Sequence, residues 1–101
     1  MSGIKLLGTG SAVASKVVTN DDLAKIVDTN DEWISTRTGI RSRRYCAEGE
    51  SHTSLCLAAA RQALGRAGVK PEEVGVCIVA TLTPDYLTPA TACLLQRELG
   101  M

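Results

Sequence analysis

The chain has 101 residues, enough for one small domain. Its 11 acidic and 11 basic residues cancel, so the overall charge gives no indication of a nucleic-acid or membrane-surface partner. No apolar run reaches the length of a transmembrane helix, and the N-terminus lacks a signal-peptide pattern. Without any Phe, the core must be built from aliphatic side chains, which suits a layered α/β fold.

The first half of the chain is expected to alternate strands and short helices. The expected elements are a strand at 4–11, a helix at 21–27 capped by Asn20, a helix between Asn30 and Gly39, and a strand at 40–46. Gly8 and Gly10 do not complete a dinucleotide-binding fingerprint, because position 13 is Val. They are expected to allow a tight turn or the close approach of another backbone.

The second half continues the alternation. The expected elements are a helix from 51 to 67, capped by Ser51 or Thr53 and ended by Gly68, a strand at 74–81, a loop at 82–88, and a helix from Pro89 to Leu99 stopped by Gly100. The strand at 74–81 is almost continuously apolar and β-branched, which is typical of a central strand covered on both faces.

The four cysteines, Cys46, Cys56, Cys77 and Cys93, form no C-x-x-C pair or metal-like cluster. Reduced thiols in a cytoplasmic protein without a metal site are the simplest explanation. Cys93 is a tempting nucleophile, but it lies past the first turn of its helix, at a position expected to be buried. His52 is the only His, and nothing in the sequence places it beside a thiol.

The stretch 28–40 holds the only Trp and is the best candidate for a binding site. Trp33 and Arg37 lie four residues apart, so both occupy one face of the expected helix. An indole and a guanidinium on one face can bind a flat aromatic ligand by stacking and cation–π contact. Hydroxyls suited to phosphate or ribose oxygens come from Thr29, Thr36 and Thr38. From the spacing alone, a structural Trp–Arg pair that holds the helix to the domain is the better explanation, because such pairs are common.

Four arginines follow closely without an intervening acid: Arg37, Arg41, Arg43 and Arg44. Such a patch suits the phosphates of a nucleotide-like ligand or an acidic partner protein. For Arg43 and Arg44, a solvated strand face is an equally good explanation.

Several of these motifs together identify a resemblance. They are Thr-Asn-Asp-Asp-Leu at 19–23, Val-Asp-Thr-Asn-Asp-Glu-Trp-Ile-Ser-Thr-Arg-Thr-Gly-Ile at 27–40, Val-Ala-Thr at 79–81, Thr-Pro-Asp-Tyr at 83–86 and Pro-Ala-Thr-Ala-Cys at 89–93. Over essentially the whole chain, they resemble the N-terminal region of the β-ketoacyl-acyl carrier protein synthase III family. The resemblance implies a thiolase-like α/β fold, a mixed sheet covered by helices. Residues 1–101 would be the N-terminal part of its first half, which is incomplete here, and no second domain is expected.

The resemblance also assigns roles to residues. In the family, the residues matching Trp33 and Arg37 sandwich the adenine of coenzyme A, and those matching Thr29 and Thr38 line the same groove. This reverses the preference for a purely structural Trp–Arg pair. Many members carry Phe at the position of Thr88, which reaches across a homodimer to close the partner's acyl pocket. The smaller Thr88 predicts acceptance of longer or branched primers.

The implied reaction starts type II fatty-acid synthesis: acyl-CoA and malonyl-acyl carrier protein give a 3-oxoacyl product, CO2 and CoA. Acyl-CoA is a substrate, so no cofactor is expected. The family's Cys–His–Asn triad is expected beyond Met101, and Cys93 matches a Cys that is not the nucleophile. The isolated chain is therefore expected to be inactive. It is also expected to be marginally stable or to aggregate, since three strands leave apolar edges uncovered.

Two alternatives remain open at this point. Related synthases that start polyketide or signalling-molecule synthesis share these N-terminal motifs. From a different class, the chain is also compatible with a stand-alone, non-catalytic CoA-binding or dimerisation module.

Overall fold

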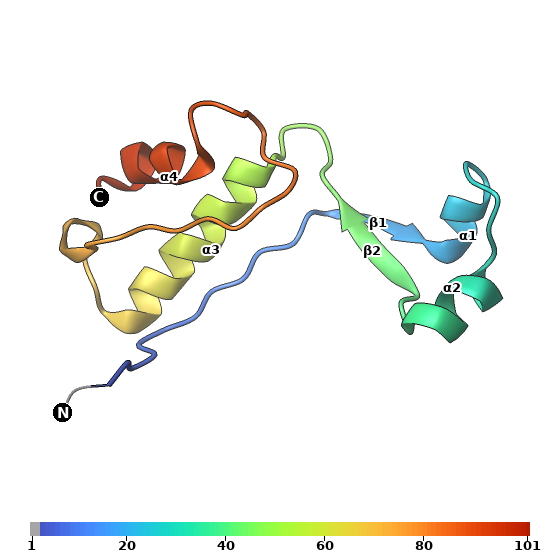
Figure 1. Ribbon diagram of the computed structural model, residues 1–101, viewed down its shortest axis with the longest axis horizontal. Coiled ribbons are helices and arrows are strands. Elements are labelled where there is room, and N and C mark those ends of the chain that lie inside the picture. The colour runs from blue at the N-terminus through green and yellow to red at the C-terminus, as the bar shows by residue number, and fades with distance from the viewer. Residues whose placement is uncertain (1–2) are drawn as a thin grey trace. The chain divides into compact units, whose positions relative to one another are not determined.

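The computed structural model describes residues 3–101, which divide into two compact units. One unit is formed by the chain up to Ala12 together with Glu50–Met101, and the other by Val13–Gly49. The elements are β1 Lys16–Thr19, α1 Asn20–Ala24, α2 Asp31–Thr38, β2 Ser42–Tyr45, α3 His52–Ala67, the 3-10 turn η1 Pro71–Glu73 and α4 Thr91–Leu99 (Figure 1). The chain is thus a partial α/β fold of helices and a small antiparallel sheet, and the predicted fold class is confirmed. None of the helices within residues 3–101 has the length and apolarity needed to cross a membrane.

The unit Val13–Gly49 is built on an antiparallel pair of strands. β1 and β2 pair with Val18 opposite Arg43. β2 confirms the strand expected at 40–46, whereas β1 was not predicted, because its four residues carry only two apolar side chains. Val18 is buried and anchors this small sheet.

Helix α1 begins one residue earlier than predicted. Thr19, not Asn20, is its N-cap: the Thr19 hydroxyl accepts a hydrogen bond from the N–H of Asp22, whose carboxylate accepts one from the N–H of Thr19. This reciprocal capping box satisfies two donors at once, which explains why Thr19 takes the cap and leaves Asn20 inside the helix. The helix also ends at Ala24, short of the predicted 27.

Helix α2 confirms its predicted boundaries. The Asn30 side chain accepts a 2.7 Å hydrogen bond from the N–H of Trp33, and Gly39 ends the helix with a positive φ of 70°. Glycine adopts this left-handed conformation without a steric penalty.

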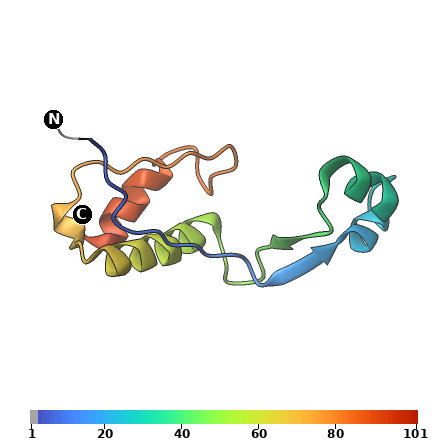
Figure 2. The same ribbon diagram turned by 90° about the horizontal axis from the view of Figure 1, so that it is seen from below.

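In the other unit, the segment 3–12 runs alongside α3 (Figures 1 and 2). A Cβ atom on Gly10 would lie 2.0 Å from the carbonyl oxygen of Ala59, and one on Gly8 would lie 2.7 Å from that of Ala63. The two glycines therefore permit the close backbone approach that the sequence suggested. Helix α3 itself begins after Ser51 in a capping box and ends at Gly68, as predicted.

Two predicted strands are absent. Residues 4–11 and 74–81 have no hydrogen-bonded strand partner among residues 3–101, where the only sheet pairs β1 with β2. A β-strand requires a neighbour for its ladder of hydrogen bonds, and the apolar pattern alone does not supply one. Several apolar side chains of these segments consequently face solvent, with Ile4 104% and Ile78 85% exposed, whereas Val74 and Val79 are half-buried.

The last helix also starts later than predicted. α4 begins at Thr91 after Ala90, and Pro89 follows a cis peptide bond with Thr88 instead of opening the helix. Its buried positions are Thr91 and Leu95, four residues apart on one face. Cys93 lies off this face and is exposed, so the prediction that it is buried was wrong.

Two aspartates that cap helices have a lowered pKa. The carboxylate of Asp22 accepts the N–H of Thr19, and that of Asp85 accepts the hydroxyl and N–H of Thr53; these hydrogen bonds are the main causes. A carboxylate with a lowered pKa stabilises the fold fully at a pH above 3.8, the ordinary pKa of Asp. This stabilisation is lost as the pH falls through the lowered pKa.

We expect the free energy of unfolding, measured with urea from pH 6 downward, to fall in this acidic range. The slope should be shallower in Asp22→Asn and Asp85→Asn; unchanged slopes would contradict the assignment.

Candidate functional site

The side chains of Trp33 and Arg37 lie on one face of α2, as their spacing predicted. The Arg37 guanidinium carbon lies 4.4 Å from the centre of the Trp33 ring. Trp33 nevertheless remains 52% exposed. A flat ring inserted between two groups needs about 7 Å, because each contact takes about 3.5 Å. The 4.4 Å between Arg37 and Trp33 is too short for a ligand ring to lie between them. A ligand ring can therefore contact Trp33 only at the part of the indole that the guanidinium does not cover.

A cavity of about 520 Å³ borders Trp33, and Arg37 is not among its walls. It is lined by Leu23, Val27, Asp28, Thr29, Asn30, Trp33 and Ile34. The hydroxyl oxygen of Thr29 is buried there without a hydrogen-bond partner. A buried polar atom without a partner is costly unless a ligand or water satisfies it. The cavity therefore combines an apolar wall with an accessible indole, whereas the hydroxyl oxygen of Thr29 beside it is enclosed by protein atoms.

The threonines later in α2 are engaged differently. The Thr38 hydroxyl donates to the carbonyl of Ile34 at 2.7 Å and accepts from the N–H of Ile40 at 3.0 Å. The Thr36 hydroxyl donates to the carbonyl of Glu32 at 2.6 Å. Both hydroxyls thus donate to carbonyls four residues earlier in their own helix, and neither residue lines the cavity. The cavity brings Thr29 and Trp33 together, Arg37 contacts Trp33 without lining the cavity, and Thr38 does not line it.

Asn20 connects the elements around this site, a role that the sequence did not predict, since it indicated only a helix cap. It is 1% exposed, and its amide nitrogen donates to the Asp31 carboxylate and the Ile40 carbonyl, both at 2.8 Å. Its side-chain oxygen accepts a 2.7 Å hydrogen bond from Arg43. Asn20 therefore connects the first turn of α2 to β2. An Asn directly before two acidic residues is typical of a helix cap, so local sequence offered no signal for this role.

We expect Asn20→Ala to lower the free energy of unfolding by about 2 kcal/mol, because it leaves the Arg43 guanidinium and the Ile40 carbonyl without their partner. The start of α2, which carries Trp33, should loosen with it. Urea denaturation measures the first effect, and Trp33 fluorescence anisotropy measures the second. Ser42→Ala, on the exposed part of β2, is the matched control. Equal stability of the two variants would contradict this role.

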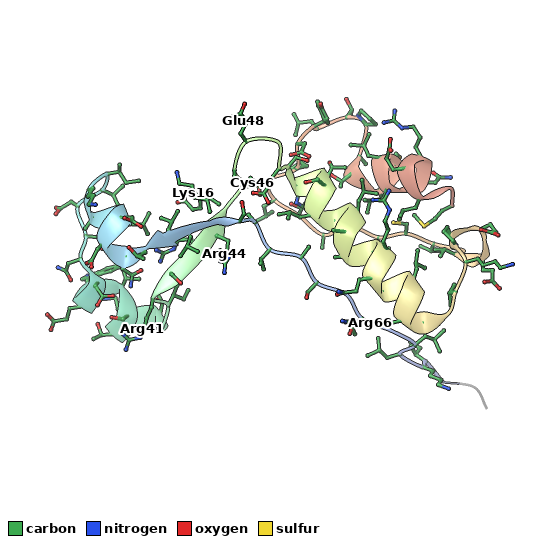
Figure 3. The ribbon with its side chains drawn as sticks, turned by 180° about the vertical axis from the view of Figure 1, so that it is seen from behind. Lys16, Arg41, Arg44, Cys46, Glu48 and Arg66 are labelled. Carbon is green, nitrogen blue, oxygen red and sulfur yellow. The ribbon has the colours of Figure 1, made fainter. Side chains whose placement is uncertain are left out.

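The arginine patch is smaller than the sequence suggested. Arg43 donates to the carbonyl of Val18 at 3.1 Å as well as to Asn20, and Arg44 donates to the carbonyl of Ala14 at 3.3 Å. These two arginines thus stabilise the sheet through hydrogen bonds to the chain around β1. Figure 3 shows Arg41 near the foot of β2, and within residues 3–101 its side chain makes no hydrogen bond or ion pair. Arg37 and Arg41 remain for an anionic ligand.

The other unit carries a thiol beside an imidazole. The sulfur of Cys56 lies 3.6 Å from Nε2 of His52, one helical turn away, so the expectation that His52 has no thiol neighbour was wrong. Burial, followed by the negative charge of Asp85, raises the pKa of Cys56. A raised pKa disfavours the thiolate, which is the nucleophilic form of a cysteine. Within residues 3–101, no group of three or more His, Cys, Asp or Glu is suited to a metal ion. Thr88 lies exposed in the loop before α4.

Comparison with known proteins links these features to one family, although no family model matches the chain. The chain is 48% identical over 100 residues to β-ketoacyl-[acyl-carrier-protein] synthase III of Clostridium acetobutylicum, covering 99% of this chain and 30% of that protein. It is 48% identical over 101 residues to the same enzyme of Thiobacillus denitrificans, covering 100% of this chain and 32% of that protein. The chain thus spans about a third of the length of the curated relatives it matches.

Solved structures agree. 3-Oxoacyl-[acyl-carrier-protein] synthase III from Aquifex aeolicus superposes with a TM-score of 0.89 at 51% identity, over 97% of this chain and 32% of that one. The priming β-ketosynthase of the R1128 polyketide pathway gives 0.86 at 40% identity, over 95% of this chain and 29% of that one. These matches confirm the resemblance and the partial thiolase-like fold predicted from the motifs: the chain is homologous over its whole length to β-ketoacyl-[acyl-carrier-protein] synthase III.

Proposed function

We propose that this chain supplies the coenzyme A groove of an enzyme that starts fatty-acid synthesis by condensing acyl-CoA with malonyl-acyl carrier protein. The observation that carries this proposal is the cavity beside Trp33, which is lined by the exposed indole together with Thr29 and the apolar side chains of Leu23 and Ile34. The 48% identity to named synthases supports the same assignment.

In the proposed complex, adenine stacks on the face of Trp33 that Arg37 leaves open, and Thr29 lines the same cavity. Arg37 holds the indole by the 4.4 Å stacking contact and, with Arg41, provides positive charge for the phosphates. Thr38 contributes by fixing the end of α2 through its two hydrogen bonds. This arrangement modifies the sandwich that the family resemblance implied, because the guanidinium already occupies one side of the ring.

For the reaction, a cysteine thiolate takes the acyl group from acyl-CoA and releases CoA. Malonyl-acyl carrier protein then loses CO2, and the carbanion that forms attacks the acyl-cysteine thioester, which frees the thiolate and gives the 3-oxoacyl product. We place this Cys and its His and Asn partners beyond Met101, so residues 1–101 are the N-terminal part of the first thiolase-like half. The complete enzyme is proposed to be a cytoplasmic homodimer, and residues 1–101 alone to be inactive.

Two assays test the proposal. The protein that contains this chain should condense acetyl- or longer acyl-CoA with malonyl-acyl carrier protein, measured by release of free CoA thiol. Titration with CoA should also change the fluorescence of Trp33, the single Trp in these 101 residues, with any Trp outside them replaced by Phe. Absence of both condensation and the fluorescence change would refute the proposal. A fluorescence change without condensation would favour the stand-alone binding module.

A second function within the same chemistry is the priming of polyketide synthesis. The TM-score of 0.86 to a priming β-ketosynthase favours keeping it as a candidate. The choice of acyl carrier protein separates the two: a fatty-acid enzyme should prefer the carrier of fatty-acid synthesis, and a polyketide enzyme should prefer a carrier from a polyketide pathway.

We predict that Thr88→Phe narrows the primer range of the enzyme. Thr88 is exposed in these 101 residues, and in the proposed dimer a larger ring at this position fills space at the end of the partner's acyl pocket. The kcat/KM for medium-chain acyl-CoA should fall about tenfold relative to that for acetyl-CoA, which corresponds to about 1.4 kcal/mol. Thr88→Ser is the control. An unchanged ratio in Thr88→Phe would contradict the prediction.

A further inference from the structure

We propose that Asp85 is a positioning residue for the acyl primer, because it ties the loop 82–90 to the start of α3. The inference rests on the proposed function, in which Thr88 of this loop borders the acyl pocket.

The contacts of Asp85 cross a large gap in sequence. One carboxylate oxygen accepts from the N–H of His52 at 3.3 Å, and the other accepts from the N–H and the hydroxyl of Thr53 at 2.9 and 2.6 Å. His52 and Thr53 are the first two residues of α3, whose N–H groups have no partner within the helix. A carboxylate at this positive helix end is favoured by charge as well as by hydrogen bonding.

The rest of the loop is weakly held within residues 3–101. Leu82 and Leu87 are 99% and 93% exposed, and the other side-chain hydrogen bond of the loop, from the N–H of Thr83 to the hydroxyl of Thr81, is local. Asp85 therefore provides the side-chain hydrogen bonds that join this loop to a distant helix. Because Thr88 follows only three residues later, the position of Thr88 depends on this attachment.

The test uses Asp85→Asn and Thr53→Val in the protein that contains this chain. Asp85→Asn removes the carboxylate charge and replaces one accepting oxygen by an amide N–H, which cannot accept from the backbone N–H that faces it. Thr53→Val removes only the 2.6 Å hydrogen bond from the hydroxyl. The matched control is Asp21→Asn, at an exposed aspartate in the first turn of α1 that makes no side-chain hydrogen bond within residues 3–101.

We expect amide hydrogen exchange in residues 82–90 to rise about tenfold in Asp85→Asn, the effect of losing hydrogen bonds to a charged group, and to rise less in Thr53→Val. The ratio of kcat/KM for acetyl-CoA to that for a medium-chain acyl-CoA should shift at least about threefold in the same order, mainly through KM. The control should change neither quantity.

The outcomes separate the two proposals. If wild-type protein condenses primers but Asp85→Asn leaves either the loop exchange or the primer ratio unchanged, the role of Asp85 is overturned while the proposed function stands. A loss of stability without a shift in the primer ratio would likewise reduce Asp85 to a helix cap. If wild-type protein condenses no primer, the proposed function fails, and the primer-positioning role fails with it.

Discussion

Gly10→Ala is expected to destabilise the unit that contains α3 by at least about 3 kcal/mol, enough to unfold a marginally stable protein. The added Cβ would lie 2.0 Å from the carbonyl oxygen of Ala59 and 2.7 Å from the backbone nitrogen of Ala63. Both are backbone atoms of a helix, so they cannot move aside as a flexible side chain would. Relief requires the segment 3–12 to leave α3, which also breaks the hydrogen bond from the Ser11 N–H to the Gln62 side chain.

Urea denaturation followed by circular dichroism measures this effect. Gly65→Ala is the matched control, because a Cβ at Gly65 meets nothing within 4 Å and the residue lies inside α3. Alanine has the higher helix propensity, so this control should be more stable by about 0.5–1 kcal/mol. A Gly10→Ala variant as stable as the wild type would show that the close packing of the segment on α3 is wrong.

Trp33→Ala is expected to weaken CoA binding by about 10- to 100-fold. Stacking of a base on an aromatic side chain contributes about 1–3 kcal/mol, and every 1.4 kcal/mol is a factor of ten. The variant also removes a wall of the cavity and the surface on which Arg37 rests. Isothermal titration of the protein with CoA measures the loss of affinity.

A comparison of ligands gives this prediction its specificity. Pantetheine carries the thiol arm of CoA without the nucleotide, so Trp33→Ala should leave its binding unchanged. Tyr45→Ala removes an exposed aromatic side chain from β2, outside the cavity, and should leave the binding of both ligands unchanged. Equal losses for CoA and pantetheine would place the adenine elsewhere.

Local sequence signals predicted most of the helices. Asn30, Gly39, Ser51, Gly68 and Gly100 mark helix boundaries in the structure as they did in the sequence. These residues act through hydrogen bonds and backbone conformations within one turn, so their effect needs no knowledge of the rest of the fold. The prediction failed at Pro89, where the helix begins two residues later.

Strands were less predictable because their partners lie far away in sequence. The apolar run at 74–81 indicates a buried strand, but its neighbour in a sheet is not found within residues 3–101. Conversely, β1 carries a weak pattern and forms because β2 pairs with it.

For the candidate site, the sequence by itself determined the helix face shared by Trp33 and Arg37, since their four-residue spacing places them together in any α-helix. Only the tertiary structure decided that Thr29 lines a cavity with Trp33 and that its hydroxyl oxygen is buried without a partner. The same holds for Asn20 and Asp85, whose hydrogen bonds reach up to 33 residues along the chain. Such contacts depend on how distant segments fold together, which spacing within a motif does not contain.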